Sequence, residues 1–162
     1  MKATRFLSLF FALIAVPTAF AAAPGSLDPT FGIGGKVARN FSDPVYIQGV
    51  AVQPDGKIVI TGLATNGATR DFMVIRLNAN GDYDPTFGTG GLVYTDISGR
   101  FDDPNAVVIQ SDGKIVVGGT SSVGGWGDMA FVRYMPNGSL DTTFDGDGIL
   151  LLNSFPGLVG DS

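Results

Sequence analysis

Apolar residues along most of the chain come in short runs separated by turn residues, a pattern typical of β-strands rather than helices. One such run covers residues 49–53, a Pro-Asp-Gly turn follows at 54–56, and a second run covers 57–63. Because glycine readily takes a positive φ in a tight turn, the two runs are predicted to pair as a hairpin. Further strands are predicted at 71–77 and 91–97, which makes four strands in succession.

This pattern occurs twice, with a period of 57 residues. The ten residues that begin at Gln53 return from Gln110, and seven of the ten are identical. Other anchors hold nearly the same spacing: Asp71 and Asp128, Arg76 and Arg133, Asn-Gly at 80–81 and 137–138, and Asp-Pro/Thr-Thr-Phe at 28–31, 84–87 and 141–144. Several independent anchors with one period indicate a repeat architecture. We place the copies at about 27–83 and 84–140, with a partial copy at 141–162.

Each repeat is predicted to form one small antiparallel sheet that is covered on both sides. Residues 58–60 and 115–117 are apolar at consecutive positions, without polar alternation. A strand that is apolar on both faces must be buried on both faces, as happens when sheets stack on one another. Four-stranded sheets that stack radially form a β-propeller. The fold class expected is therefore all-β, with two four-stranded antiparallel propeller-like blades.

The repeated motifs carry a family resemblance. The pattern Asp-Pro/Thr-Thr-Phe-Gly-x-Gly-Gly, then Gln-x-Asp-Gly-Lys-Ile-Val, then Asp-x-x-x-x-Arg and Asn-Gly, resembles the bacterial delta-60 repeat. The resemblance covers residues 27 to about 153. It implies a β-propeller on a secreted or surface protein, and it implies no reaction common to the family.

The order of the strands is also similar to that of NHL and gluconolactonase-like propellers. That likeness implies inner strands at 47–53 and 105–110, with Pro44 and Pro104 before them, and outer strands at 91–97 and 148–153. It makes residues 35–41 an extra N-terminal strand without a blade of its own. Closed propellers have about four to eight blades, so two blades make an incomplete propeller. We expect either a fragment of a larger propeller protein or self-association that covers the open faces.

The first residues have the features of a secretory signal peptide. Lys2 and Arg5 precede an apolar run at 6–16, and Ala19-Phe20-Ala21 fits the small-x-small pattern before a cleavage point. The run is too short to span a bilayer, which takes about 20 residues. We therefore expect a signal peptide at 1–21, a repeat domain at 22–162 without a membrane span, and a secreted, periplasmic or cell-surface location.

Composition excludes several kinds of chemistry. The chain has no Cys and no His, and all its acidic residues are Asp. Disulfides, thiolate metal sites and imidazole general bases are therefore ruled out. The net charge is −5, and removal of Lys2 and Arg5 makes it more negative, so nucleic acid is an unsuitable partner. We expect no cofactor and no enzymatic activity.

The recurrent acidic residues are predicted to be structural. Asp28, Asp84 and Asp141 precede tight turns, while Arg76 and Arg133 lie on strands. Because they recur in every copy, a repeated ion pair or an Asp side chain that accepts backbone N–H groups explains them better than acid catalysis.

A calcium site is the alternative for the oxygen-rich turns. Alternating Asp and Asn side chains suit Ca²⁺, which takes six to eight oxygen ligands. The candidate ligands are Asn78, Asn80, Asp82, Asp145 and Asp147. Without Glu there is no bidentate closing ligand of the EF-hand type, and Asn-Gly and Asp-Gly also form ordinary hairpin turns.

Residues that do not recur are better candidates for binding, because the scaffold does not require them. Loops between strands two and three, and between outer and inner strands, are expected on one face of the propeller. They supply Asp43, Tyr46, Asn66, Arg70, Arg100, Asp102, Asp103 and Trp126. Trp126, the single Trp, lies between two glycines and could stack on a sugar or a partner side chain.

These observations favour a secreted or surface repeat module for binding or structural interaction. Its expected partner is a protein or a glycan, and its open sheet faces also favour self-association. The alternative from another class is a calcium-dependent gluconolactonase-like hydrolase. That alternative requires Asp or Asn ligands that converge at a closed channel.

Overall fold

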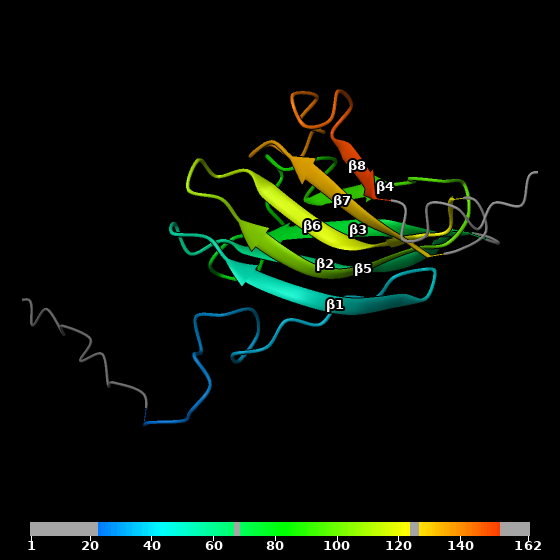
Figure 1. Ribbon diagram of the computed structural model, residues 1–162. Helices are drawn as coiled ribbons and strands as arrows, with labels where there is room; N and C mark the ends of the chain where they lie inside the picture. Colours follow the sequence, from blue (N-terminus) through cyan, green and yellow to red (C-terminus); the bar gives the residue numbers. More distant parts are fainter. Residues whose placement is uncertain (1–22, 67–68, 124–126, 153–162) are drawn as a thin grey trace, which may run out of the picture.

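The computed structural model describes residues 23–66, 69–123 and 127–152, and within them it is all-β (Figure 1). Two four-stranded antiparallel sheets have the orders β1-β2-β3-β4 and β5-β6-β7-β8. We call them blade 1 and blade 2. The strands are β1 (Val45–Val52), β2 (Ile58–Asn66), β3 (Thr69–Leu77), β4 (Leu92–Thr95), β5 (Asp102–Ile109), β6 (Ile115–Ser121), β7 (Asp128–Tyr134) and β8 (Ile149–Leu152). The two predicted four-stranded sheets are confirmed.

The Asp-Gly turns that join the first two strands of each blade have the predicted conformation. Gly56 and Gly113 both have a φ of 83°. In the first turn the Gly56 N–H donates to the carbonyl of Gln53, and the Asp55 carboxylate accepts the N–H of Lys57 at 3.1 Å. A side chain with a Cβ is strained at this φ, which explains why both copies place glycine here.

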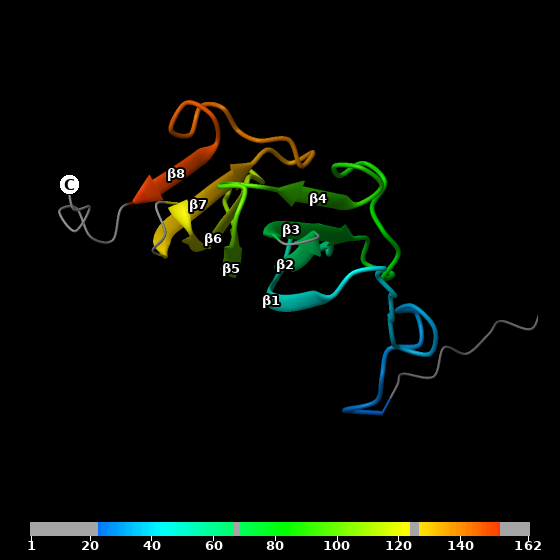
Figure 2. The ribbon, with the colours of Figure 1, turned by 90° about the vertical axis from the view of Figure 1, so that its right-hand side faces the viewer.

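The two blades stack face to face, as Figure 2 shows. Their shared core combines Val59, Phe72 and Val74 of blade 1 with side chains of blade 2, which are Ile115, Val117, Ala130, Val132 and Tyr134. All of these are fully buried. A hydrogen bond of 2.7 Å between the hydroxyls of Thr95 and Tyr134 also crosses this interface. The consecutive apolar residues of β2 are therefore explained by stacking, as the sequence predicts.

One proline lies inside a strand rather than before it. Pro44 precedes β1 as predicted, whereas Pro104 is the third residue of β5. The β5–β6 register shifts between Pro104 and Ala106, so the strand is bulged at this point. A proline without an N–H is tolerated there, because β5 is an edge strand of its sheet.

The expected extra strand at 35–41 does not form. This segment contributes one isolated bridge, between Gly32 and Lys36. The corresponding segment of the next repeat is β4, which pairs with β3 of its own blade. No preceding blade is described that could offer 35–41 such a strand, so it stays irregular. It still packs on blade 1, where Val37 and Phe41 contact a second core of Ala64, Met73, Ile75 and Leu77.

Two expectations concern residues outside the described ranges: the signal peptide at 1–21 and the last ten residues, 153–162, of the partial copy at 141–162. Among the residues that the structure describes, no helix is long and apolar enough to cross a membrane.

Candidate functional site

The recurrent Asp and Arg form a buried ion pair between the blades. In blade 1 the Asp84 carboxylate accepts from Arg76 Nε at 2.8 Å and from Lys57 Nζ at 3.1 Å. It also accepts the N–H and hydroxyl of Thr86, at 3.0 and 2.7 Å. Arg76 Nη1 donates to the carbonyl of Pro136 in blade 2. The pair therefore closes the turn before β4 and joins the two sheets.

The other two copies of this motif are progressively simpler. Asp141 accepts from Arg133 Nε at 2.7 Å and from Lys114 Nζ at 3.0 Å, and the Arg133 side chain is 19% exposed against 6% for Arg76. The exposed Asp28 accepts the N–H and hydroxyl of Thr30, at 2.8 and 2.6 Å. The predicted ion pair and the predicted turn-closing carboxylate are thus both confirmed.

These contacts explain the titration of the recurrent carboxyls. Burial alone would raise the pKa of Asp84, but donors on Thr86 and Lys57 and the charge of Arg76 hold it well below its usual value. For Asp141 the Thr143 hydroxyl is the main cause of a lowered pKa, and burial opposes it. Carboxylates held in the ionised form stabilise the turns, and they do not donate protons near neutral pH.

The predicted binding loops do meet at one end of the blades. The Arg70 N–H donates to the carbonyl of Arg100 at 3.0 Å, which ties the β2–β3 hairpin to the β4–β5 connection. The Arg70 guanidinium lies 3.8 Å from the Asp103 carboxylate and 5.3 Å from the centre of the Phe101 ring. Arg70 and Arg100 are exposed, so charged side chains do gather where the loops were predicted to emerge.

Asp102 differs from its predicted place in an exposed loop. It is the first residue of β5 and is fully buried. Its carboxylate accepts from the Ser98 and Ser121 hydroxyls at 3.0 and 2.6 Å, and from the Ile97 N–H at 2.8 Å. Because three donors hold it beneath the loop, the carboxylate is positioned to organise the β4–β5 connection.

The remaining predicted binding residues have separate positions. Tyr46 lies on β1 and is 59% exposed, and Asp43 is exposed just before that strand. The backbone of Asn66 ends β2, opposite Thr69, but its side chain is outside the described set. Trp126 also lies outside the described residues. Binding by these residues stays a prediction.

The predicted calcium ligands are engaged in turns. Asn80 donates to the Asp82 carboxylate at 2.9 Å, and Asn78 donates to the carbonyl of Tyr83 at 3.3 Å. Asp147 accepts the N–H of Ile149 at 2.8 Å, and Asp145 has a φ of 51°, a backbone conformation otherwise taken here by glycines. Among the described residues, Asp82, Asp145 and Asp147 belong to no group of three carboxylates that could hold one ion.

A different carboxylate cluster does have the spacing of a cation site. Asp71, Asp96 and Asp102 each offer an oxygen, and these oxygens lie within 4.8 Å of one another. Carboxylate oxygens at such distances suit a hard divalent cation such as Ca²⁺. The three residues come from β3, from the end of β4 and from β5, so no sequence spacing could have revealed the cluster.

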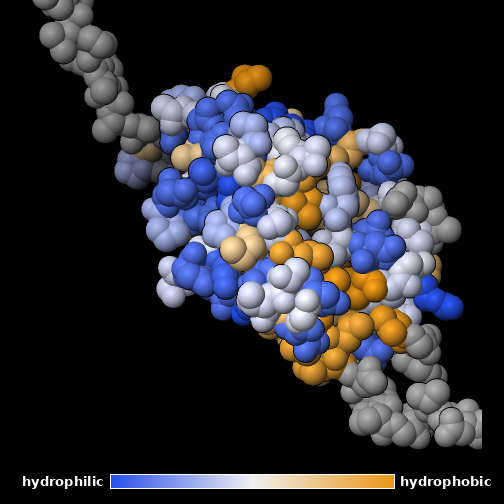
Figure 3. Space-filling view, turned by 90° about the horizontal axis from the view of Figure 1, so that it is seen from above, coloured by the Kyte–Doolittle hydropathy of each residue, from blue (hydrophilic) through white to orange (hydrophobic). Residues whose placement is uncertain are grey.

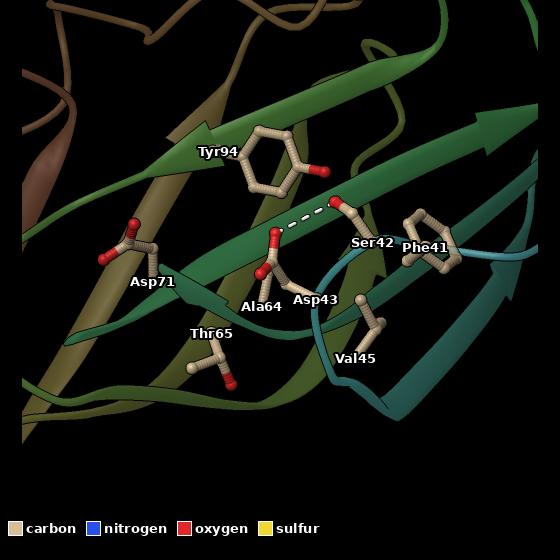
Figure 4. A pocket seen from close by; sticks show the side chains of 8 residues that line it. All are labelled: Phe41, Ser42, Asp43, Val45, Ala64, Thr65, Asp71 and Tyr94. Carbon is tan, nitrogen blue, oxygen red and sulfur yellow. Dashed lines mark hydrogen bonds between the residues drawn. The ribbon is translucent and has the colours of Figure 1, made fainter. Parts of the chain in front are cut away.

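A cleft of about 350 Å³ lies between the N-terminal segment and blade 1 (Figure 4). Its lining residues are Phe41, Ser42, Asp43, Val45, Ala64, Thr65, Asp71 and Tyr94. Burial raises the pKa of Tyr94, and nearby Tyr83 and Asp43 add to the effect. An acidic cleft with an aromatic wall can hold a small cationic or polyhydroxylic group. Of the lining residues, Asp43 is the one predicted from the sequence as a binding residue.

Comparison with known proteins agrees with this architecture. Two segments, 53–87 and 110–144, match the family described as a domain of unknown function (DUF5122) beta-propeller. Each segment covers the Asp-Gly turn, the second and third strands and the Asp-x-Thr-Phe motif of one blade. No curated protein matches the chain. The chain therefore contains two segments that match the repeat of this β-propeller family, one in each blade.

Proposed function

We propose that this protein is an exported interaction module that binds a partner protein through the open face of blade 2. The signal-peptide pattern at the N-terminus supports export, and the repeat fold supports a role as a scaffold for binding. The lack of His, Cys and Glu favours binding over catalysis. The observation that carries the proposal is an apolar sheet face that no described segment of the chain covers.

That face consists of the side chains of blade 2 that point away from blade 1, and we call it the open face. Its apolar members are Val108, Val116, Met129, Phe131, Leu150 and Leu152. Along β6 and β7 the residues that face blade 1 are mostly buried, while those that alternate with them are partly or fully exposed. Val108 is 57%, Met129 47% and Leu152 41% exposed. Figure 3 views the protein from the side on which β8 lies and shows apolar side chains gathered there.

Exposed apolar area of this kind marks interaction sites on soluble proteins. Edge strands and uncovered sheet faces also favour association with another chain. The proposed partner is therefore a protein with an apolar surface. A glycan partner would instead use the polar loops around Arg70 and Arg100.

Site-specific photo-crosslinking in the producing cells tests this function. A photoreactive residue at Val108 should give crosslinks to protein, whereas one at Ile33, which is 91% exposed on a loop away from the open face, should give few. Fractionation of the same cells should place the protein outside the cytoplasm. Equal crosslinking at both positions, or retention in the cytoplasm, would contradict the proposal.

The carboxylate cluster favours one second candidate, a calcium-dependent hydrolase similar to gluconolactonases. On that hypothesis Ca²⁺ should raise the melting temperature, and Asp96→Asn should abolish the rise, since Asp96 is the exposed member of the cluster. Asp55→Asn, in an exposed turn, is the matched control. Lactone hydrolysis that depends on Ca²⁺ and on Asp96 would support the hydrolase over the interaction module.

A further inference from the structure

The 57-residue repeat indicates what should cover the open face of blade 2. Val116, Met129 and Phe131 are the repeat equivalents of Val59, Phe72 and Val74 in blade 1. Those three blade 1 residues are fully buried because blade 2 packs on them. The open face is therefore the same surface as an interface that already exists within the molecule, but no described segment packs on it as blade 2 packs on blade 1.

The occupant of the existing interface is the opposite face of the following blade. In blade 2 that opposite face presents Ile115 and Val117. Their equivalents in blade 1 are Ile58 and Ile60, which lie on the face of blade 1 that points away from blade 2. Beside them on β1, Val50 and Val52 are 65% and 66% exposed. A second copy of the chain thus carries a surface of the required kind.

We propose that two copies of this protein associate head to tail, with blade 1 of one copy packed on the open face of blade 2 of the other. This inference rests on the proposed function and names its partner as a second copy of the chain. Because each copy keeps one unused face, further copies can add until a ring closes. Closed propellers have about four to eight blades, so two-bladed chains would need about two to four copies.

The recurrent arginine offers a polar contact for the same arrangement. Arg76 lies 4.6 Å from the centre of the Phe87 ring and donates to the carbonyl of Pro136 in the next blade. Arg133 holds the same pose, 4.5 Å from the centre of the Phe144 ring. The equivalent of Pro136 is Ala79, which is exposed in blade 1. In the head-to-tail contact, Arg133 would donate to the Ala79 carbonyl of the second copy.

Association of this kind must displace the N-terminal segment from part of blade 1. The Gly32 N–H donates to the carbonyl of Asn80 at 2.7 Å, as the Gly88 N–H donates to Asn137 at 2.8 Å across the existing interface. The segment thus occupies the place that Phe144 and Asp145 of a second copy would take. It leaves the β1 side of the face open, and the second copy competes with it for the rest.

Complementation between two variants of the full chain tests the proposal. Val50→Asp places a charge on the blade 1 face, and Val108→Asp places one on the open face of blade 2. Both residues are exposed valines on inner strands, so neither change should unfold the protein. Ser111→Asp, which adds the same charge at an exposed position in the β5–β6 turn, outside both faces and outside the N-terminal segment, is the control. Sedimentation velocity measures the association of each variant and of mixtures.

The wild type and Ser111→Asp should associate, and each face variant alone should weaken association by about tenfold or more. An equimolar mixture of the two face variants should recover a dimer and nothing larger, because each copy then keeps one intact face. If the contact instead joined two open faces, Val50→Asp would not change association and mixing the two face variants would restore nothing. That result would overturn the head-to-tail arrangement. A monomeric wild type would also overturn it. If Val108 still crosslinked another protein in cells, the proposed function would stand.

Weakening the N-terminal segment supplies a second measurement. Phe31→Ala removes the ring that packs near Gly81, so the segment should leave blade 1 more easily. The association constant of this variant should rise severalfold. An unchanged or lower constant would contradict the displacement step.

Discussion

Removal of the Asp84 carboxylate should destabilise the protein more than removal of the equivalent carboxylate of Asp141 or Asp28. Asp84→Ala takes away the acceptor of Arg76 Nε and of both donors on Thr86. The Arg76 side chain is only 6% exposed, so its charge would remain in the interface between the blades without its carboxylate. The change therefore affects the turn before β4 and the contact between the sheets together.

The expected loss can be estimated from the burial of this pair. Removing one partner of a buried ion pair costs about 3–5 kcal/mol, because the other charge is left uncompensated. Arg76 keeps its bonds to Thr86 and to the carbonyl of Pro136, which favours the lower end. We expect a loss of about 3 kcal/mol in the free energy of unfolding. For a chain of this length that corresponds to a fall of about 6–12 °C in Tm.

Denaturant unfolding of three single variants compares the stability lost when Asp84, Asp141 or Asp28 is removed. Asp84→Ala should lose most, and Asp141→Ala less because Arg133 is more exposed. Asp28→Ala should lose least, because Asp28 is exposed and, among the described residues, its carboxylate accepts hydrogen bonds from Thr30 alone. Adding Arg76→Met to Asp84→Ala should restore part of the loss, since it removes the uncompensated charge. Equal losses for Asp84→Ala and Asp28→Ala, or a double variant less stable than Asp84→Ala alone, would show that the buried charge of Arg76 is not the cause of the loss.

Three further predictions follow from individual contacts. The lowered pKa of Asp84 makes its contribution to stability complete above about pH 4, the unfolded value, and lost as the pH falls below it. Denaturation at several pH values should show this slope, and Asp84→Asn should make it shallower, while the lowered pKa of Asp141 supplies part of the slope that remains. Gly56→Val and Gly113→Val should each cost about 1–3 kcal/mol in chemical denaturation, because a β-branched residue is strained at positive φ; no loss in either would refute the turn assignment. Tyr134→Phe should cost about 1–2 kcal/mol, because the Thr95 hydroxyl loses its partner between the blades, and Thr95→Val in the same chain should show coupling in a double-mutant cycle.

The architecture was predictable because the local sequence pattern of each repeat indicates its strands and turns. The Asp-Gly pairs around Gly56 and Gly113 mark the hairpins, and the consecutive apolar residues at 58–60 require cover on both faces. The Asp84–Arg76 pair was predictable because both residues recur at a constant spacing. Local pattern and period together therefore fix the blades and their stacking.

The irregular conformation of 35–41 could not be inferred from the repeat, since this segment occupies the position that β4 occupies in the next copy. What differs is the neighbour: β4 has β3 beside it, whereas 35–41 has no such strand in the described chain. The cluster of Asp71, Asp96 and Asp102 likewise depends on how three segments meet. Asp102 was misplaced for the same reason, because its burial comes from Ser98 and Ser121 packing over it. Sequence patterns report pairing within a repeat more reliably than contacts between segments.

If the open face of blade 2 is an interaction surface, oxidation of its methionine should depend on whether that surface is occupied. Met129 lies on that face and is 47% exposed, whereas Met73 is fully buried in blade 1 and provides an internal reference. Mass spectrometry after brief peroxide treatment would follow both residues over a range of protein concentrations. We predict that Met129 is oxidised rapidly in dilute protein and becomes protected as the protein concentration rises, while the oxidation of Met73 stays slow at every concentration. Rapid oxidation of Met129 at every concentration, and equally in the producing cells, would contradict it.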